Sequence, residues 1–301
     1  MNPKEKERQC EKAFDRVQHY WHAYTSGKET PVLFVNDEDF AFVMNVVAYA
    51  AYERLKSVRI IAFQIMGNHF HFILMGNQGE VEAFYAIIKR KLSRTFPEMK
   101  NVKLSLKTIC DLAALRNNIV YVNRNGYVAH PDYTPFSSPW GTSQYYFNRY
   151  HFNGELKDLY SSTLRIMFRG RDPQLPEEWK TVDNKYIIPA SYCAIKFGMS
   201  LFRDAHHYFS MVSKNVEAYS GVATDIDEDD FLTDGELFSK IITIIKEQYN
   251  TGMLRDLSKA QILELARKLH YDFRSSNAQI RRLLKLTQYE VDTLFPLSVK
   301  Y

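Results

Sequence analysis

The stretch 67–75 constrains the fold more than any other part of the chain, because two histidines interrupt an apolar run at alternate positions. Successive side chains of a β-strand point to opposite faces, so His69 and His71 share one face and the neighbouring phenylalanines enter a core on the other. Two imidazoles on one rigid face form half of a metal site. A histidine at a strand edge beside a satisfied interior one explains the same pair, and both interpretations stay open here.

Length and composition indicate a globular protein. With 301 residues and 46% hydrophobic content, the chain can bury one sizeable core and a smaller one. The charged N-terminus has no apolar segment behind it, and the longest apolar stretch, 40–52, is too short to span a bilayer, so we expect a cytoplasmic protein without membrane contact. Three cysteines far apart predict neither a disulfide framework nor a zinc site.

Charge is segregated along the chain. Residues 54–150 hold 13 Lys and Arg against 5 Asp and Glu, whereas residues 225–236 hold 7 acids and no bases. A basic first half suits a polyanionic partner, although a solvated surface explains any basic excess equally well.

Hydrophobic periodicity predicts an α+β domain at the N-terminal end. The patterns favour a strand over 19–26, a helix from the Asn36 cap to about residue 55, strands over 58–66 and 69–75, and a helix over 80–96. This order of strand, helix, strand, strand and helix is typical of a ferredoxin-like antiparallel sheet with helices.

A third helix, predicted over 111–125, carries polar residues at helical spacing. Tyr121 and Asn125 are four residues apart, so a phenol and an amide oxygen can approach the same point. An aromatic ring packed at the edge of the core is the alternative explanation for Tyr121. Gly126 is expected to end the helix, which would leave Tyr127 and Tyr133 outside that register.

These residues together resemble the single-tyrosine HUH transposases, most closely the REP-associated tyrosine transposases, which belong to the IS200-like group. The similarity covers roughly residues 18–148, and Gly67 and Gly126 stand where the family usually has proline. The motifs that carry it are Trp21-His22, Leu33-Phe34, the run from Ala62 to His71, the run from Tyr121 to Asn125, and the run from Tyr133 to Ser138.

The resemblance implies an activity and a set of roles. His69, His71 and Asn125 would bind one divalent ion, Mg²⁺ or Mn²⁺, and Tyr121 would attack the scissile phosphate of DNA to give a 5′-phosphotyrosine and a free 3′-OH. A phenol with a pKa of about 10 needs such help at neutral pH. Basic side chains would hold the DNA backbone, with Lys89, Arg90, Lys91 and Arg94 as the candidates in the first half.

Beyond residue 150 the resemblance fades, and we divide the chain into a catalytic domain, 1–150, and a helical region, 151–301. Residues 146–189 indicate a linker with short elements, and helices are predicted over 190–219, 234–249 and 257–269. Residues 276–295 resemble a helix-turn-helix, although a structural helical hairpin explains them as well. Residues 255–285 hold 8 bases against 3 acids, and Arg281, Arg282 and Lys285 are the candidate phosphate contacts.

Two functions of different classes therefore remain. The first is a metal-dependent DNA transposase or endonuclease acting on single-stranded or hairpin DNA, as a monomer or homodimer. The second is a domesticated, catalytically silent DNA-binding protein with the same fold. Retention of His69, His71, Asn125 and Tyr121 favours the enzyme, because a silent binder has no physical need for them.

Overall fold

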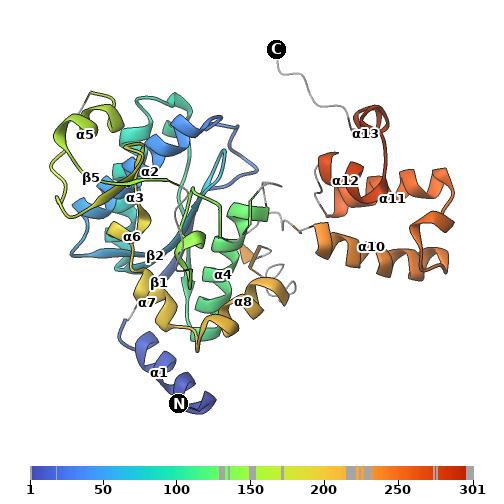
Figure 1. The fold of residues 1–301 in the computed structure, drawn as a ribbon, viewed down its shortest axis with the longest axis horizontal. Coiled ribbons are helices and arrows are strands. Elements are labelled where there is room, and N and C mark those ends of the chain that lie inside the picture. The colour runs from blue at the N-terminus through green and yellow to red at the C-terminus, as the bar shows by residue number, and fades with distance from the viewer. Residues whose placement is uncertain are drawn as a thin grey trace. The chain divides into compact units, whose positions relative to one another are not determined.

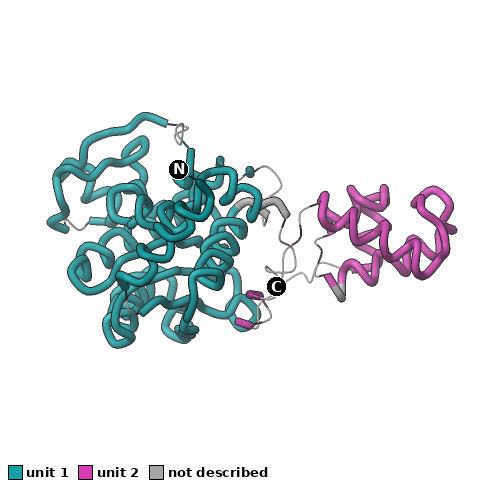
Figure 2. The backbone as a smooth tube through the Cα atoms, turned by 90° about the horizontal axis from the view of Figure 1, so that it is seen from below, with its two compact units in different colours: residues 1–218 teal, residues 219–301 magenta. Residues whose placement is uncertain are grey.

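The computed structural model describes residues 2–17, 19–128, 133–134, 136–148, 154–170, 173–214, 222–223, 225–226, 232, 234–273, 275 and 277–295; at residues 127–128, 213–214, 271–272 and 278 it describes the backbone alone. The chain forms two compact units, residues 1–218 and 219–301 (Figure 2). The division expected at residue 150 lies instead near residue 218, because the segment after residue 150 packs into the first unit. One such contact is the hydrogen bond from Arg116 Nε to the Leu201 carbonyl, 2.6 Å.

A four-stranded antiparallel sheet with strand order β2-β3-β1-β4 forms the centre of the first unit (Figure 1). Along the chain, a helix follows the first strand and another separates the third strand from the fourth, which is the element order of a ferredoxin-like arrangement. The predicted α+β class is confirmed. The elements are β1 (Tyr20–Tyr24), α2 (Asp37–Glu53), β2 (Val58–Ile65), β3 (Phe70–Gly76), α3 (Gln78–Leu92) and β4 (Ser105–Ile109).

Different helices cover the two faces of this sheet (Figure 1). α2 and α3 cover the face that carries Phe72, whose ring centroid lies 5.5 Å from that of Phe84 in α3. Burying such a ring stabilises the fold by about 1.5–3 kcal/mol. α4 (Leu112–Val128) covers the other face, which carries His71. The alternation predicted for the stretch 67–75 is confirmed, since phenyl and imidazole rings face different layers.

Several elements of the first unit were not predicted. The segment 146–189 contains short elements, as expected, but it is not a linker, because three of them form a second, three-stranded sheet that docks on α2. Asn45 of α2 holds it through two hydrogen bonds of 2.9 Å, donating to the Lys185 carbonyl and accepting from the Ile187 amide. The strand β4 and the N-terminal helix were also missed. The helical character predicted over 190–219 is confirmed by α6 (Pro189–Tyr192), α7 (Ile195–Ser200) and α8 (Ala205–Lys214). The further elements are α1 (Pro3–Phe14), η1 (Pro97–Lys100), η2 (Ser143–Tyr145), β5 (Leu156–Asp158), α5 (Ser161–Met167), β6 (Lys180–Val182) and β7 (Tyr186–Ile187).

The described part of the second unit is helical, as predicted. Ser258 caps α11 through a reciprocal capping box with Gln261, which confirms the predicted cap. Two short helices, joined by residues 285–287, lie in the segment 276–295 for which a helix-turn-helix or a structural hairpin was expected. No helix among the described residues of the chain is long and apolar enough to cross a membrane. The elements are α10 (Asp234–Tyr249), η3 (Leu254–Asp256), α11 (Lys259–Asp272), α12 (Asn277–Leu284) and α13 (Gln288–Leu294).

Candidate active site

His71 lies at the centre of the candidate site, on the interior strand β3. Its register partners are Gln64 in β2 and Tyr24 in β1, and directly opposed residues of antiparallel strands share a face. α4 covers this face, and the ring centroid of Tyr121 lies 5.6 Å from that of His71, edge-on at 89°. The ring centroid of His69 lies 4.9 Å from that of His71. The prediction that both histidines lie on an interior strand facing the Tyr121 helix holds for His71, whereas His69 precedes β3 and lies beside His71.

A hydrogen-bond chain selects the tautomer of His71. Asn118 Nδ2 donates to the Ala114 carbonyl at 2.8 Å, which leaves its Oδ1 as the acceptor 2.8 Å from His22 Nδ1. His22 Nδ1 must therefore donate, and neutral His22 accepts at Nε2 from His71 Nδ1 at 3.1 Å. The lone pair of His71 then resides on Nε2, a buried atom without a hydrogen-bond partner.

Asn68 selects the same tautomer for His69. Its Nδ2 donates to the carbonyls of Gly27 and Thr30, both at 2.8 Å, so that its Oδ1 accepts from His69 Nδ1 at 2.6 Å. Gly27 has no room for a side chain, because a Cβ would lie 2.9 Å from His69 Nδ1. In both histidines Nδ1 is protonated and Nε2 carries the lone pair, which is how metal-bound histidines are commonly held.

Burial keeps the three imidazoles neutral. It lowers the pKa of His22 to about 4, against a smaller opposing effect of the Asn118 hydrogen bond, and it lowers the pKa of His69 to about 4. Burial also holds the pKa of His71 well below its ordinary value, and repulsion from His69 and His22 in their protonated forms lowers it further. At neutral pH these side chains present lone pairs rather than positive charges, as metal coordination requires.

Asn125 follows Tyr121 by one turn of α4 and is buried, as the spacing predicted for a helical pair. The helix does not end at Gly126, however, but continues to Val128. Gly126 is instead a point of close packing, because a Cβ there would overlap Gln64 Oε1 and lie 2.6 Å from Ser138 Oγ. The prediction that the helix ends at Gly126 is therefore wrong. This glycine instead makes room for the side chains of Gln64 and Ser138.

The residues present fit a divalent ion, provided that an amide oxygen joins the imidazoles. Among the described residues, no group of three or more His, Cys, Asp or Glu side chains is placed to hold a metal. The predicted set of His69, His71 and Asn125 combines two imidazole nitrogens with one amide oxygen. The buried lone pair on His71 Nε2 supports this fit, because a buried acceptor without a donor is costly unless something electropositive reaches it.

The site is enclosed. His69, His71, Tyr121 and Asn125 are each between 0 and 5% exposed. A DNA phosphate therefore reaches them only after a covering segment moves.

Four of the basic residues predicted to bind DNA lie away from this site. The sheet separates them from Tyr121, because α3 covers the phenylalanine face and α4 the histidine face. Lys91 Nζ lies 3.6 Å from the ring centroid of Tyr49, whereas Arg90 and Arg94 are exposed. Their contact with DNA stays a prediction. The four, on α3 and just beyond its end, are Lys89, Arg90, Lys91 and Arg94.

The basic residues predicted in the second unit differ in their environments. Arg282 Nε and Nη2 donate to both carboxylate oxygens of Asp234, at 2.8 and 3.0 Å, and this contact lowers the pKa of Asp234. Arg281 Nη1 donates to Gln288 Oε1 at 2.8 Å, and Lys285 is exposed. Arg282 thus joins α10 to α12, while Arg281 and Lys285 are better placed for a phosphate.

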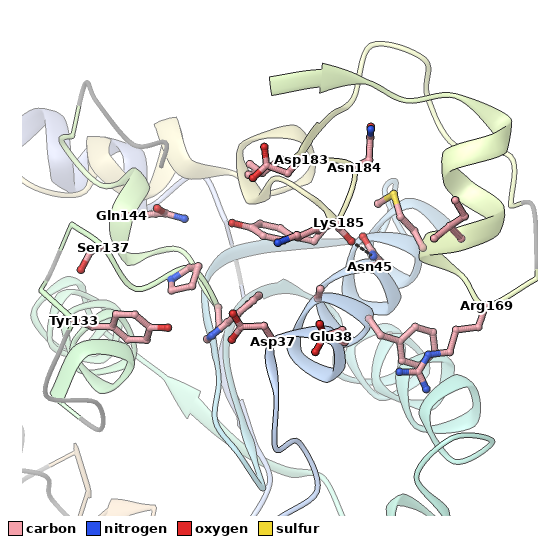
Figure 3. Close-up of a pocket in the computed structure, with 18 residues that line it drawn as sticks. Asp37, Glu38, Asn45, Tyr133, Ser137, Gln144, Arg169, Asp183, Asn184 and Lys185 are labelled. Carbon is pink, nitrogen blue, oxygen red and sulfur yellow. Dashed lines mark hydrogen bonds between the residues drawn. The ribbon is translucent and has the colours of Figure 1, made fainter. Parts of the chain in front are cut away.

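Of the two alternative nucleophiles, only Tyr133 has a described side chain, and its environment differs from that of Tyr121. The side chain of Tyr127 lies outside the described residues. Tyr133 lines a cavity of about 480 Å³ between the start of α2 and the second sheet, with Gln144 on the same side and Arg169 on the other (Figure 3). Neither His71 nor Tyr121 lines this cavity.

Comparison of the chain with family models, with curated proteins and with solved structures finds no match in any of the three.

Proposed function

We propose that this chain is a metal-dependent DNA strand transferase of the single-tyrosine HUH type, which cleaves and rejoins single-stranded or hairpin DNA. The observation that carries the proposal is the edge-on contact of Tyr121 with His71, whose Nδ1 is held by His22. That hydrogen bond leaves a lone pair on His71 Nε2, on the sheet face that α4 covers.

Three side chains would hold the ion. His69, His71 and Asn125 supply two imidazole nitrogens and one amide oxygen, a set that leaves coordination positions for a phosphate and for water and suits Mg²⁺ or Mn²⁺. Such an ion, when bound, would draw electron density from the scissile phosphate. His22 and Asn68 keep the imidazoles in the ligating tautomer.

Tyr121 is the nucleophile in this proposal. Its hydroxyl oxygen bonds to phosphorus while the bond from phosphorus to the 3′ oxygen breaks, so the phenol loses a proton and the leaving oxygen gains one. The product is a 5′-phosphotyrosine and a free 3′-OH. Because the new ester conserves the energy of the phosphodiester, a 3′-OH can attack it later and rejoin the strand without ATP.

The rest of the chain would position DNA. In this proposal residues 276–295 act as a DNA-binding helix-turn-helix, with Arg281 and Lys285 contacting phosphates. The protein would work in the cytoplasm, as a monomer or homodimer.

The enclosure of the site favours a second candidate, a catalytically silent DNA-binding protein. Four side chains that must meet a phosphate are at most 5% exposed. A protein that only binds DNA needs no opening of this kind, and the contacts of His69, His71, Tyr121 and Asn125 would then serve packing alone.

Incubation of the full chain with 5′- and 3′-labelled hairpin and single-stranded DNAs, with Mg²⁺ or Mn²⁺, separates the two. A covalent adduct resistant to denaturation supports the enzyme, and peptide mapping should place it on Tyr121. Tyr121→Phe keeps the ring and removes one oxygen, so the adduct should vanish while DNA binding remains.

Tyr85→Phe is the matched control, because it removes a buried hydroxyl from the other layer, where Tyr85 Oη donates to the Val102 carbonyl. That variant should form the adduct normally. If an adduct persists in Tyr121→Phe and maps to Tyr127 or Tyr133, that tyrosine is the nucleophile instead. If the parent protein forms no adduct with either ion, the result favours the catalytically silent DNA-binding protein.

A further inference from the structure

Gln64 presents a buried oxygen that nothing in the described structure satisfies. The side chain is 1% exposed and its Oε1 has no hydrogen-bond partner. The amide orientation is defined, because Nε2 donates to the Ile65 carbonyl at 3.1 Å. Such a lone pair costs stability unless a donor or a cation meets it.

Two glycines make room for this oxygen. A Cβ at Gly126 in α4 would overlap Gln64 Oε1, and so would a Cβ at Gly141, whose backbone forms an isolated bridge with Gln64. Ser138 Oγ, also buried and without a partner, lies 2.6 Å from the same Cβ position of Gly126. Gly141 and Gly126, the residue after Asn125, therefore leave space for the Gln64 oxygen between their backbones.

Two of the unsatisfied atoms on this face are of one chemical kind. Gln64 stands directly opposite His71 across β2 and β3, so their side chains share the face that α4 covers. Gln64 Oε1 and His71 Nε2 both carry lone pairs and no proton. A phosphodiester brings only further acceptors, so it cannot satisfy them without a cation in between.

We infer that Gln64 supplies a second amide oxygen, beside that of Asn125, to the cation that His69 and His71 hold. The inference rests on the proposed function, and neither the His-x-His motif nor the Tyr121 helix assigns this residue. Amide oxygens are ligands that Mg²⁺ and Mn²⁺ accept, and two of them give a neutral site that retains the full charge of the ion for a phosphate.

Mn²⁺ binding by the full chain tests this inference without reference to catalysis. Isothermal titration and electron paramagnetic resonance of free Mn²⁺ give the dissociation constant, and thermal unfolding is compared in EDTA and in Mn²⁺. Gln64→Met keeps the length and removes the oxygen, so the dissociation constant should rise about tenfold or more, by analogy with the loss of a metal-site contact. Its melting temperature in EDTA should change little, because the loss of a costly lone pair offsets the loss of the Nε2 hydrogen bond to the Ile65 carbonyl.

Thr181→Val is the matched control, since Thr181 Oγ1 is likewise buried without a partner but belongs to the second sheet. It should bind Mn²⁺ like the parent. Gln64→Glu provides a second test in case Gln64→Met does not fold. Its melting temperature should fall in EDTA and recover with Mn²⁺. Mn²⁺ should also bind to it more tightly than to the parent protein, because a carboxylate strengthens a cation site.

The outcomes separate this inference from the proposed function. Unchanged Mn²⁺ affinity in Gln64→Met, or no recovery of Gln64→Glu by Mn²⁺, overturns the role of Gln64 even if the parent protein forms the DNA adduct. If the parent protein binds Mn²⁺ through Gln64 but forms no adduct, the proposed strand transfer is refuted and the cation site with Gln64 is supported.

Discussion

His22 Nε2 lies 3.1 Å from His71 Nδ1, on the face of the sheet that α4 covers. This contact, together with that of Asn118 on the far side of the ring, makes His22 the residue that selects which nitrogen of His71 is free. Replacing His22 by phenylalanine keeps a ring of similar size and removes both hydrogen bonds. We expect Mn²⁺ affinity, measured by titration calorimetry, to fall about 10- to 100-fold.

His19→Ala is the control for that experiment, because His19 is exposed and precedes the same strand. It should leave Mn²⁺ binding unchanged. Equal binding by His22→Phe and the parent protein would show that the tautomer is held by other means.

Acidification should destabilise the metal-free protein. The pKa of His22 and of His69 is about 4 in the folded chain, lowered by burial from an ordinary value of 6.5. The unfolded chain binds more protons between these values, so the free energy of unfolding should decrease as pH falls from 6.5 toward 4. Each histidine would contribute about 1.4 kcal/mol per pH unit in that window.

Urea denaturation in EDTA at several pH values from 7 to 5 measures this effect before most carboxylates titrate. His22→Phe removes one of the titrating groups, so its stability should depend less steeply on pH. An identical slope in the variant would contradict the assignment.

Gly126→Ala should destabilise the protein, although alanine normally favours a helix over glycine by about 1 kcal/mol. The added Cβ would overlap Gln64 Oε1, and overpacking of this kind costs about 1–3 kcal/mol. Thermal or chemical unfolding measures the change. The double variant with Gln64→Ala should recover part of the loss, whereas strictly additive effects would mean that the two side chains do not compete for the same space.

Arg281→Ala and Lys285→Ala should each weaken DNA binding and reduce its dependence on salt by about one released counterion per lost phosphate contact. Fluorescence anisotropy across a salt titration measures both quantities. Arg282→Ala should act differently, lowering the stability of the helical unit, because Arg282 is bound to Asp234. If Arg281→Ala and Lys285→Ala both kept the affinity and the salt dependence of the parent protein, these helices would be assigned to packing or to a protein partner.

Those parts of the fold and of the candidate site that depend on local spacing could be predicted from the sequence. The alternation of His71 and Phe72 and the helical register of Tyr121 and Asn125 are periodic patterns, and the structure has both. The strand β4 was missed because five residues show little alternation and its place depends on pairing with β1.

Contacts between distant residues could not be predicted in this way. His22 and His71 are 49 residues apart, and their contact follows from the register of β1 against β3. In the sequence, Gln64 is one polar residue in an apolar strand, and its packing against Gly126 and Gly141 depends on the tertiary structure. A lone amide inside an apolar strand, as far before the Gly67-Asn68 turn as His71 is after it, was the available signal.

The separation of α3 from α4 by the sheet has a consequence for the length of a substrate. A nucleic-acid strand that contacts both Arg90 and Tyr121 has to pass around an edge of the sheet. At the β2 edge, residues 140–142 form backbone hydrogen bonds with the strand, from the Ile65 amide to Trp140 and from Thr142 to Phe63. The other edge is β4, and the width to be crossed there is about 5 Å for each strand. Oligonucleotides too short to turn this corner would reach the tyrosine layer without touching α3, so measured affinity should rise in a step, rather than gradually, as the probe is lengthened.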